Sequence, residues 1–167
     1  MRTISSGIPA APHPSFATMA APEWKLIYWY FTPGVGRGEF VRLMFEEAGV
    51  AYDDICRKAK DSAAAMKYLR GEESGSPVQF PPIIRRGDFV LSQTPAIMEY
   101  LGKKFGLFPE GGPEDEAHAM QLTLTVADCL AECMTAFHPV SMHASYTTQV
   151  EEAKPSIEKF RTERLPK

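Results

Sequence analysis

Three hydroxyl-bearing side chains stand at positions where a small ligand can be bound and activated. Tyr28 and Tyr30 fall in the apolar segment 25–31 (KLIYWYF), which predicts a short buried strand. Side chains alternate along a strand, so both phenols are expected on one face. Thr94 precedes Pro95 at a predicted helix start, where free N–H groups and the helix dipole favour an anion. The set predicts a site for a small ligand with a carboxylate at one end and a group that needs a phenol at the other.

The elements that must hold these residues follow an alternating order of strands and helices. Apolar runs bounded by Gly and Pro predict, in chain order, strand 25–31, helix 37–48, strand 51–57, helix 61–70, hairpin 82–91 and helix 94–106. A β-α-β unit requires a parallel strand pair, and the hairpin adds two antiparallel strands. This order predicts a thioredoxin-like α/β domain. The expected buried stripe of the first helix is Phe40, Leu43, Met44 and Ala48.

The second half of the chain is predicted to be helical throughout. Helical periodicity runs over 114–137 and returns from residue 151. We divide the chain into a disordered tail or weak organellar leader at 1–22, the thioredoxin-like domain at 23–106, a linker at 107–113 and a partial all-helical domain at 114–167. The tail holds four of the 14 prolines and no acidic residue, a composition that does not favour a packed core.

The long helix carries two apolar stripes with a polar line between them. The stripes are Leu122, Val126, Cys129, Cys133 and Phe137, and Met120, Leu124, Ala127, Ala131 and Met134. A helix that is apolar on two sides packs against two neighbours. Because Cys129 and Cys133 lie on the apolar side, we interpret both as core thiols and predict no metal site with His138.

The composition excludes several classes of function. The chain has 167 residues, with 18 Lys or Arg against 21 Asp or Glu and a net charge of −3. A balance of this kind leaves no electrostatic footprint for nucleic acid or an anionic membrane. The apolar runs are shorter than the ~20 residues of a membrane-spanning helix. Three cysteines without paired spacing favour a reducing compartment, so we expect a cytoplasmic protein.

Four segments, in order, carry a resemblance to a known family. They are YF at 30–31, GRGEFVR at 36–42, PPII at 81–84 and SQTPAI at 92–97. Together they resemble the glutathione-binding domain of the Tyr-type glutathione S-transferases of the pi, mu and sigma classes. The resemblance extends from Lys25 to about Lys167, because the long helix is similar to the fourth helix of that family. It implies a cytosolic, dimeric detoxification enzyme in which the thiolate of glutathione attacks a small electrophile.

The resemblance implies a role for each matched residue on the sulfur side of the site. Tyr30 would donate its O–H to the sulfur of glutathione, which lowers the pKa of the thiol and favours the nucleophilic thiolate. The main chain at Pro81, before the cis-proline Pro82, would contact the cysteinyl backbone of glutathione. Pro81 has no N–H, so it offers only its carbonyl. Arg37 would line the site.

Further roles concern the γ-glutamyl end of the tripeptide. Gln93 and Thr94 would hold the γ-glutamyl group, with the helix N-terminus on its carboxylate. Asp128 would reach the amine of glutathione in the partner subunit of a homodimer. Glutathione enters as a co-substrate, and the resemblance implies no metal.

Three alternatives stay open at the level of the sequence. The loop 32–36 is one residue longer than in the pi-class pattern, so Tyr28 is a second candidate for the activating tyrosine and Thr32 is a third hydroxyl. The same fold also serves non-catalytic proteins with binding or structural roles. A shortened helical domain would make the chain an inactive fragment.

Overall fold

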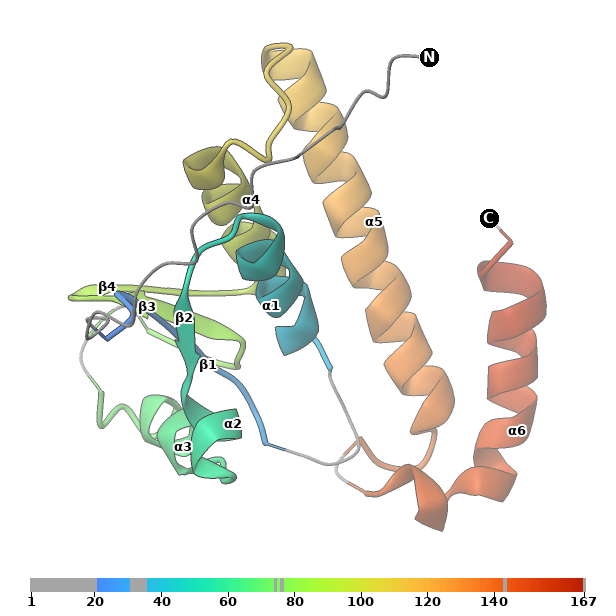
Figure 1. Cartoon of the computed structure of the whole chain (residues 1–167). Helices are drawn as coiled ribbons and strands as arrows, with labels where there is room; N and C mark the ends of the chain where they lie inside the picture. The colour runs from blue at the N-terminus through green and yellow to red at the C-terminus, as the bar shows by residue number, and fades with distance from the viewer. Residues whose placement is uncertain (1–20, 31–35, 74, 76, 143, 167) are drawn as a thin grey trace, which may run out of the picture.

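A four-stranded mixed sheet forms the centre of the first half of the chain. The computed structural model describes residues 21–30, 36–73, 75, 77–142 and 144–166. The strands are β1 (Trp24–Ile27), β2 (Tyr52–Asp54), β3 (Ile83–Arg86) and β4 (Phe89–Ser92), in the spatial order β2-β1-β3-β4. β1 pairs with β2 in parallel, and the other two pairings are antiparallel. Figure 1 shows the sheet at one side of the molecule and the two long helices at the other.

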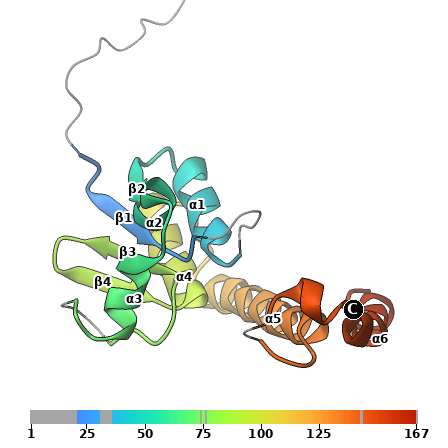
Figure 2. The same ribbon diagram turned by 90° about the horizontal axis from the view of Figure 1, so that it is seen from below.

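Helices cover both faces of this sheet and continue beyond it. α1 (Gly38–Glu47) and α4 (Thr94–Phe105) lie on one face, and α2 (Ile55–Ala59) and α3 (Ala63–Leu69) lie on the other. α5 (Pro113–Phe137) packs against α4, and α6 (Val150–Lys159) packs against α5 on the side away from the sheet (Figure 2). A 3-10 turn, Tyr146–Thr148, precedes α6, and a π-helix, Phe160–Arg164, extends it. The arrangement confirms the predicted fold class, a thioredoxin-like α/β part followed by an all-α part.

Membrane-spanning helices are absent from the described segments. None of the helices there combines the length and the apolar character that a membrane crossing requires.

Side-chain alternation along β1 divides the core into two clusters. Leu26 faces α1 and α4 and packs with Val41, Phe45, Ile84, Ile97 and Leu101. Ile27 faces α2 and α3 and packs with Cys56, Ala65, Tyr68, Ile83 and Val90. All but two of these residues are at most 2% exposed, so they exclude water from both faces of the sheet. The clusters fix the end of β1 and the start of α1, where the predicted site lies.

β1 is shorter than the sequence predicts. Its antiparallel register with β3 ends at Ile27 opposite Ile83, and the next residue on the partner side is Pro82, which has no N–H for the ladder. The predicted strand 25–31 is therefore wrong beyond Ile27. Tyr28 and Tyr30 do not share a face, because Tyr28 turns to the start of α1 and Tyr30 packs against the cluster under α2 and α3.

Two further boundaries differ from the prediction. β2 ends at Asp54, because the Asp54 carboxylate accepts the Arg57 N–H at 3.2 Å and caps α2, so the predicted strand 51–57 is wrong from Ile55 onwards. On α1 the predicted stripe is wrong at Leu43, which is 59% exposed, whereas Met44 packs against the core cluster. The buried side of this helix is instead Gly38, Val41, Arg42 and Phe45.

Candidate functional site

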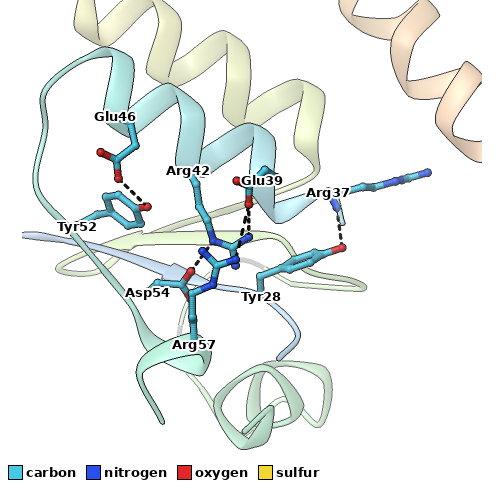
Figure 3. A network of polar contacts seen from close by, with 8 residues as sticks. All are labelled: Tyr28, Arg37, Glu39, Arg42, Glu46, Tyr52, Asp54 and Arg57. Atoms are coloured by element: carbon cyan, nitrogen blue, oxygen red, sulfur yellow. Dashed lines mark hydrogen bonds and ion pairs between the residues drawn. The ribbon is translucent and has the colours of Figure 1, made fainter. Parts of the chain in front are cut away.

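Tyr28 is the phenol that the fold fixes most firmly. It follows β1 directly and is 7% exposed. Its hydroxyl accepts a hydrogen bond from the backbone N–H of Arg37 at 2.8 Å, immediately before α1 (Figure 3). Gly38 permits this contact, since a Cβ at that position would lie 2.5 Å from the Tyr28 ring. The ring is therefore held against the first turn of α1.

The surroundings of Tyr28 keep it protonated at neutral pH. Burial raises the pKa of the phenol above its ordinary value of 10.0. The N–H groups of Arg37 and Gly38 and the positive charges of Arg37 and Arg42 act in the opposite direction, but burial has the larger effect. A protonated phenol is a hydrogen-bond donor through its O–H group. This is the chemistry that stabilises a thiolate.

Tyr30 occupies a different environment. Its backbone N–H donates to Ser62 Oγ at 2.9 Å, and its half-exposed ring packs against the cluster that contains Ile27 and Cys56. The structure does not bring Tyr30 together with Arg37 and Thr94. Its role as the activating residue stays a prediction, as does that of Thr32, which lies outside the described residues.

The start of α4 shows an unusual backbone. Thr94 is the first residue of the helix, in agreement with the predicted range 94–106. Gln93 takes the cap position with φ 74°, in the left-handed region that residues other than glycine rarely adopt. Among the described residues, Thr94 Oγ1 is buried and finds no hydrogen-bond partner. A buried hydroxyl without a partner indicates a position that a ligand can complete.

A cavity of about 300 Å³ has Arg37 and Thr94 in its lining, whereas Tyr28 is not among the residues that line it. It lies between α1, α4 and α5, with walls mostly of apolar side chains. The residues that line it are Arg37, Phe40, Thr94, Pro95, Met98, Leu122, Thr123, Val126, Ala127 and Leu130. Arg37 thus contributes its backbone to Tyr28 and lines the same cavity as Thr94.

The remaining predicted residues lie around this region or away from it. The Pro81–Pro82 peptide bond is cis, as the resemblance implies, and both prolines are buried directly before β3. Gln93 is exposed beside Thr94. Asp128 is exposed on α5 and does not line the cavity, so within one chain it does not meet Thr94. Its role toward a partner subunit stays a prediction.

The cysteines of α5 do not assemble a metal centre within the described parts of the chain, where no group of three or more His, Cys, Asp or Glu gathers. Burial raises the pKa of the Cys133 thiol, and the neighbouring Cys129 adds to this shift. His138 has other partners, since its Nδ1 lies 3.1 Å from Gln149 Nε2.

Sequence reasoning missed a buried arginine behind Tyr28. Arg42 is 5% exposed, its Nε lies 2.6 Å from Asp54 Oδ2, and its Nη1 lies 2.9 Å from Glu39 Oε2. Figure 3 shows the guanidinium between these carboxylates and the Tyr28 ring. The signal in the sequence was Arg42 between Val41 and Phe45, the residues that carry the buried side of α1.

Several curated proteins and solved structures are similar to the chain. Glutathione S-transferase 1 of Ascaris suum is 32% identical over 116 residues, which cover 70% of this chain and 51% of that protein. The glutathione S-transferase of Plasmodium falciparum (isolate 3D7) is 32% identical over 85 residues, or 50% of this chain and 40% of that protein. The crystal structure of the glutathione S-transferase from Ascaris lumbricoides covers 87% of this chain and 65% of its own, with 27% identity and a TM-score of 0.56. These relatives are glutathione S-transferases.

The similarity confirms the resemblance that the four motifs predicted. No protein-family model matches the chain. The chain spans about half the length of the curated relative from Ascaris suum and 65% of the solved one from Ascaris lumbricoides. Because the chain covers only part of these longer proteins, their activity is a proposal for this chain. Assignment to the pi, mu or sigma class stays a prediction.

Proposed function

We propose that the chain is a glutathione transferase that binds glutathione between the end of β1 and the start of α4. The observation that carries this proposal is the double position of Arg37. Its N–H holds the Tyr28 hydroxyl, and the same residue lines a cavity with Thr94. In the proposed site the Tyr28 phenol, beside the cavity-lining Arg37, meets the sulfur, and the start of α4, where Thr94 Oγ1 finds no partner among the described residues, meets a carboxylate.

Each end has a chemical task in the proposed reaction. The thiol of bound glutathione releases its proton to solvent, and the Tyr28 O–H donates a hydrogen bond to the thiolate. The thiolate forms a C–S bond with an electrophilic carbon, and the leaving group departs with the electron pair of the bond that breaks. Thr94 and the first N–H groups of α4 hold the γ-glutamyl carboxylate. The apolar side chains of the cavity favour a small hydrophobic electrophile.

This assignment makes Tyr28, rather than Tyr30, the activating residue. The hydrogen bond between the Arg37 N–H and the Tyr28 hydroxyl supports this assignment, whereas the Tyr30 ring packs toward α2 and α3. Arg37, Gln93 and the cis pair Pro81–Pro82 keep the roles that the resemblance implies. A cytoplasmic location and a homodimer, with Asp128 directed to the partner's ligand, belong to the same proposal.

Retention on immobilised glutathione and conjugation of 1-chloro-2,4-dinitrobenzene test the proposal together. The wild-type chain is expected to be retained and to conjugate. Tyr28→Phe is expected to lose about 10- to 100-fold in kcat/KM, because it removes one hydrogen bond to a developing charge. Tyr30→Phe is the matched control and is expected to keep most of the rate.

Each contrary result points to a different fault. A wild-type chain that is retained but never conjugates would show a non-catalytic binding protein. Loss of rate in Tyr30→Phe with full rate in Tyr28→Phe would return the activating role to Tyr30. A folded chain that is not retained would exclude the glutathione site itself.

A further inference from the structure

Arg42 is a cation placed where α1 should present an apolar side chain. The helix buries Val41 and Phe45 completely, and Arg42 lies beside them with 5% of its surface exposed. A buried charge is costly unless carboxylates pair with it. Asp54 at the end of β2 and Glu39 on the preceding turn of α1 supply this pairing, at 2.6 Å and 2.9 Å.

This pairing also fixes where the planar guanidinium lies. Its Nε is bound to Asp54 of β2 and its Nη1 to Glu39 of α1, so two edges of the guanidinium are held by different elements. Arg42 Cζ then stands 5.9 Å from the centre of the Tyr28 ring, within the range of a cation–π contact. The guanidinium lies over the ring whose hydroxyl accepts the Arg37 N–H, and neither Arg42 nor Tyr28 is among the residues that line the cavity.

We propose that Arg42 is a positioning residue for Tyr28: its guanidinium, pinned by Asp54 and Glu39, holds the phenol ring and makes its hydroxyl a better hydrogen-bond donor. The inference deepens the proposed function, because it rests on Tyr28 as the residue that stabilises the thiolate. It assigns a catalytic consequence to an ion pair that does not itself line the cavity.

The charged groups around Tyr28 fix the sign of the effect. Arg37 and Arg42 face it from α1, and their positive charges lower the pKa of the phenol. The Cys56 thiol of α2 lies against the backbone of Tyr28. Asp54 and Glu39 reach the ring only through Arg42 in the described contacts. Removing the Arg42 cation should raise the pKa of Tyr28 further, weaken it as a donor, and raise the pKa of the bound glutathione thiol.

Three variants and one control separate this role from a purely structural one. Arg42→Met removes the charge and keeps much of the volume. The double variant Arg42→Met/Asp54→Asn also removes the carboxylate that the first change leaves buried without its cation. Arg42→Lys keeps a charge without the planar fork. Arg57→Met is the matched control, because Arg57 faces the same Glu39 at 3.9 Å but is half exposed and makes no contact with the ring in the described structure.

Two readouts are measured on variants that circular dichroism shows to be folded. The first is the ultraviolet titration of Tyr28 in the protein without ligand, isolated by subtracting the titration of Tyr28→Phe. The second is the pH profile of kcat/KM for conjugation. In Arg42→Met and the double variant, both midpoints are expected to move to higher pH, so that the rate is lower than that of the wild type below the midpoint and equal to it well above the midpoint. Arg57→Met is expected to match the wild type.

The outcomes decide the inference in every case. Folded Arg42→Met with the wild-type titration of Tyr28 and the wild-type pH profile would overturn it. Should neither neutral variant fold, Arg42→Lys decides: an upward shift of both midpoints supports the role of the planar guanidinium, and unchanged midpoints overturn it. A wild-type chain without conjugation would defeat the proposed function, yet the titration of Tyr28 would still report on Arg42.

Discussion

The two halves of the molecule bury their apolar side chains to very different degrees. In the first half, residues of β1, β3, α1 and α4 meet in one cluster, and Leu26, Val41, Phe45, Ile97 and Leu101 are wholly buried. In the second half, α5 has 25 residues, and Ala136 alone is buried within the described structure of that helix. Leu122, Leu124 and Val126 are 68%, 48% and 49% exposed.

The comparison shows what holds each half together. Burial of apolar area is the main favourable contribution to folding, so the sheet and its covering helices have the means to fold as a unit. α5 and α6 are held in part by polar groups, such as Gln149 and the Glu132–Arg164 pair, and they leave an exposed apolar surface that favours association. The candidate cavity lies between the two halves, because α1 and α4 form one wall and α5 forms the other.

A pair of identical truncations gives the largest expected contrast. Leu101→Ala removes a wholly buried side chain from α4 and is expected to lower the free energy of unfolding by about 2–5 kcal/mol. Leu122→Ala removes an exposed leucine from α5 and is expected to change it by less than about 0.5 kcal/mol. Urea unfolding followed by tryptophan fluorescence reports on the first half, since Trp24 packs in its core.

Equal losses in the two leucine variants would break the comparison. Such a result would mean that Leu122 is covered in solution, and sedimentation of the wild-type chain would then show whether a second copy covers it. A Leu101→Ala loss below about 1 kcal/mol would mean instead that the core repacks around the cavity left by the substitution.

The same difference explains which parts of the fold the sequence could predict. The order of elements and the fold class follow from apolar runs and their Gly and Pro boundaries, which are local signals. The end of β1 is not determined locally, because it is set by Pro82, directly before the partner strand β3. The buried side of α1 was misjudged for a related reason: Arg42 is buried only because Asp54, twelve positions away, comes beside it.

The candidate site divides in the same way. Thr94 and Arg37 were predicted from motifs, and both line the cavity. The choice between Tyr28 and Tyr30 depends on where β1 ends, so alternation along an assumed strand could not make it. Thr94 Oγ1 finds no partner within the described part of the chain because of how α4 packs, which no local pattern encodes.

The hydrogen bonds of Gln149, directly before α6, are expected to make a contribution of intermediate size to stability. Gln149 is 2% exposed, and its Oε1 accepts the N–H groups of Val140 and Ser141 at 3.0 Å and 3.2 Å. Its Nε2 donates to the Ser141 carbonyl at 2.9 Å. Gln149→Ala leaves these groups without that partner and is expected to weaken the connection between α5 and α6 by about 1–3 kcal/mol.

Hydrogen exchange at the Val140 and Ser141 amides measures this effect directly. Exchange is expected to accelerate about tenfold or more in Gln149→Ala, while amides of β1 and β3 keep their protection. Gln121→Ala, at an exposed position of α5, is the matched control. Faster exchange in the sheet as well would show that the two halves unfold together, against the comparison.

The smallest effect is expected at the ion pair that joins the end of the chain to α5. Arg164 Nε lies 2.7 Å from Glu132 Oε2 and links the π-helix to the long helix. Glu158 and Arg161 form a pair at the same distance within one helical segment, so Glu158→Gln is a control that breaks no contact between helices.

Because exposed pairs contribute little, Glu132→Gln should accelerate exchange in α6 less than Gln149→Ala does. The difference in hydrogen-exchange rate between Glu132→Gln and its control Glu158→Gln should vanish at about 1 M salt, where the screening length is ~3 Å. A difference that persists there would show that Glu132 acts through packing against α6, and the second half would then possess more of a core than its exposed leucines indicate.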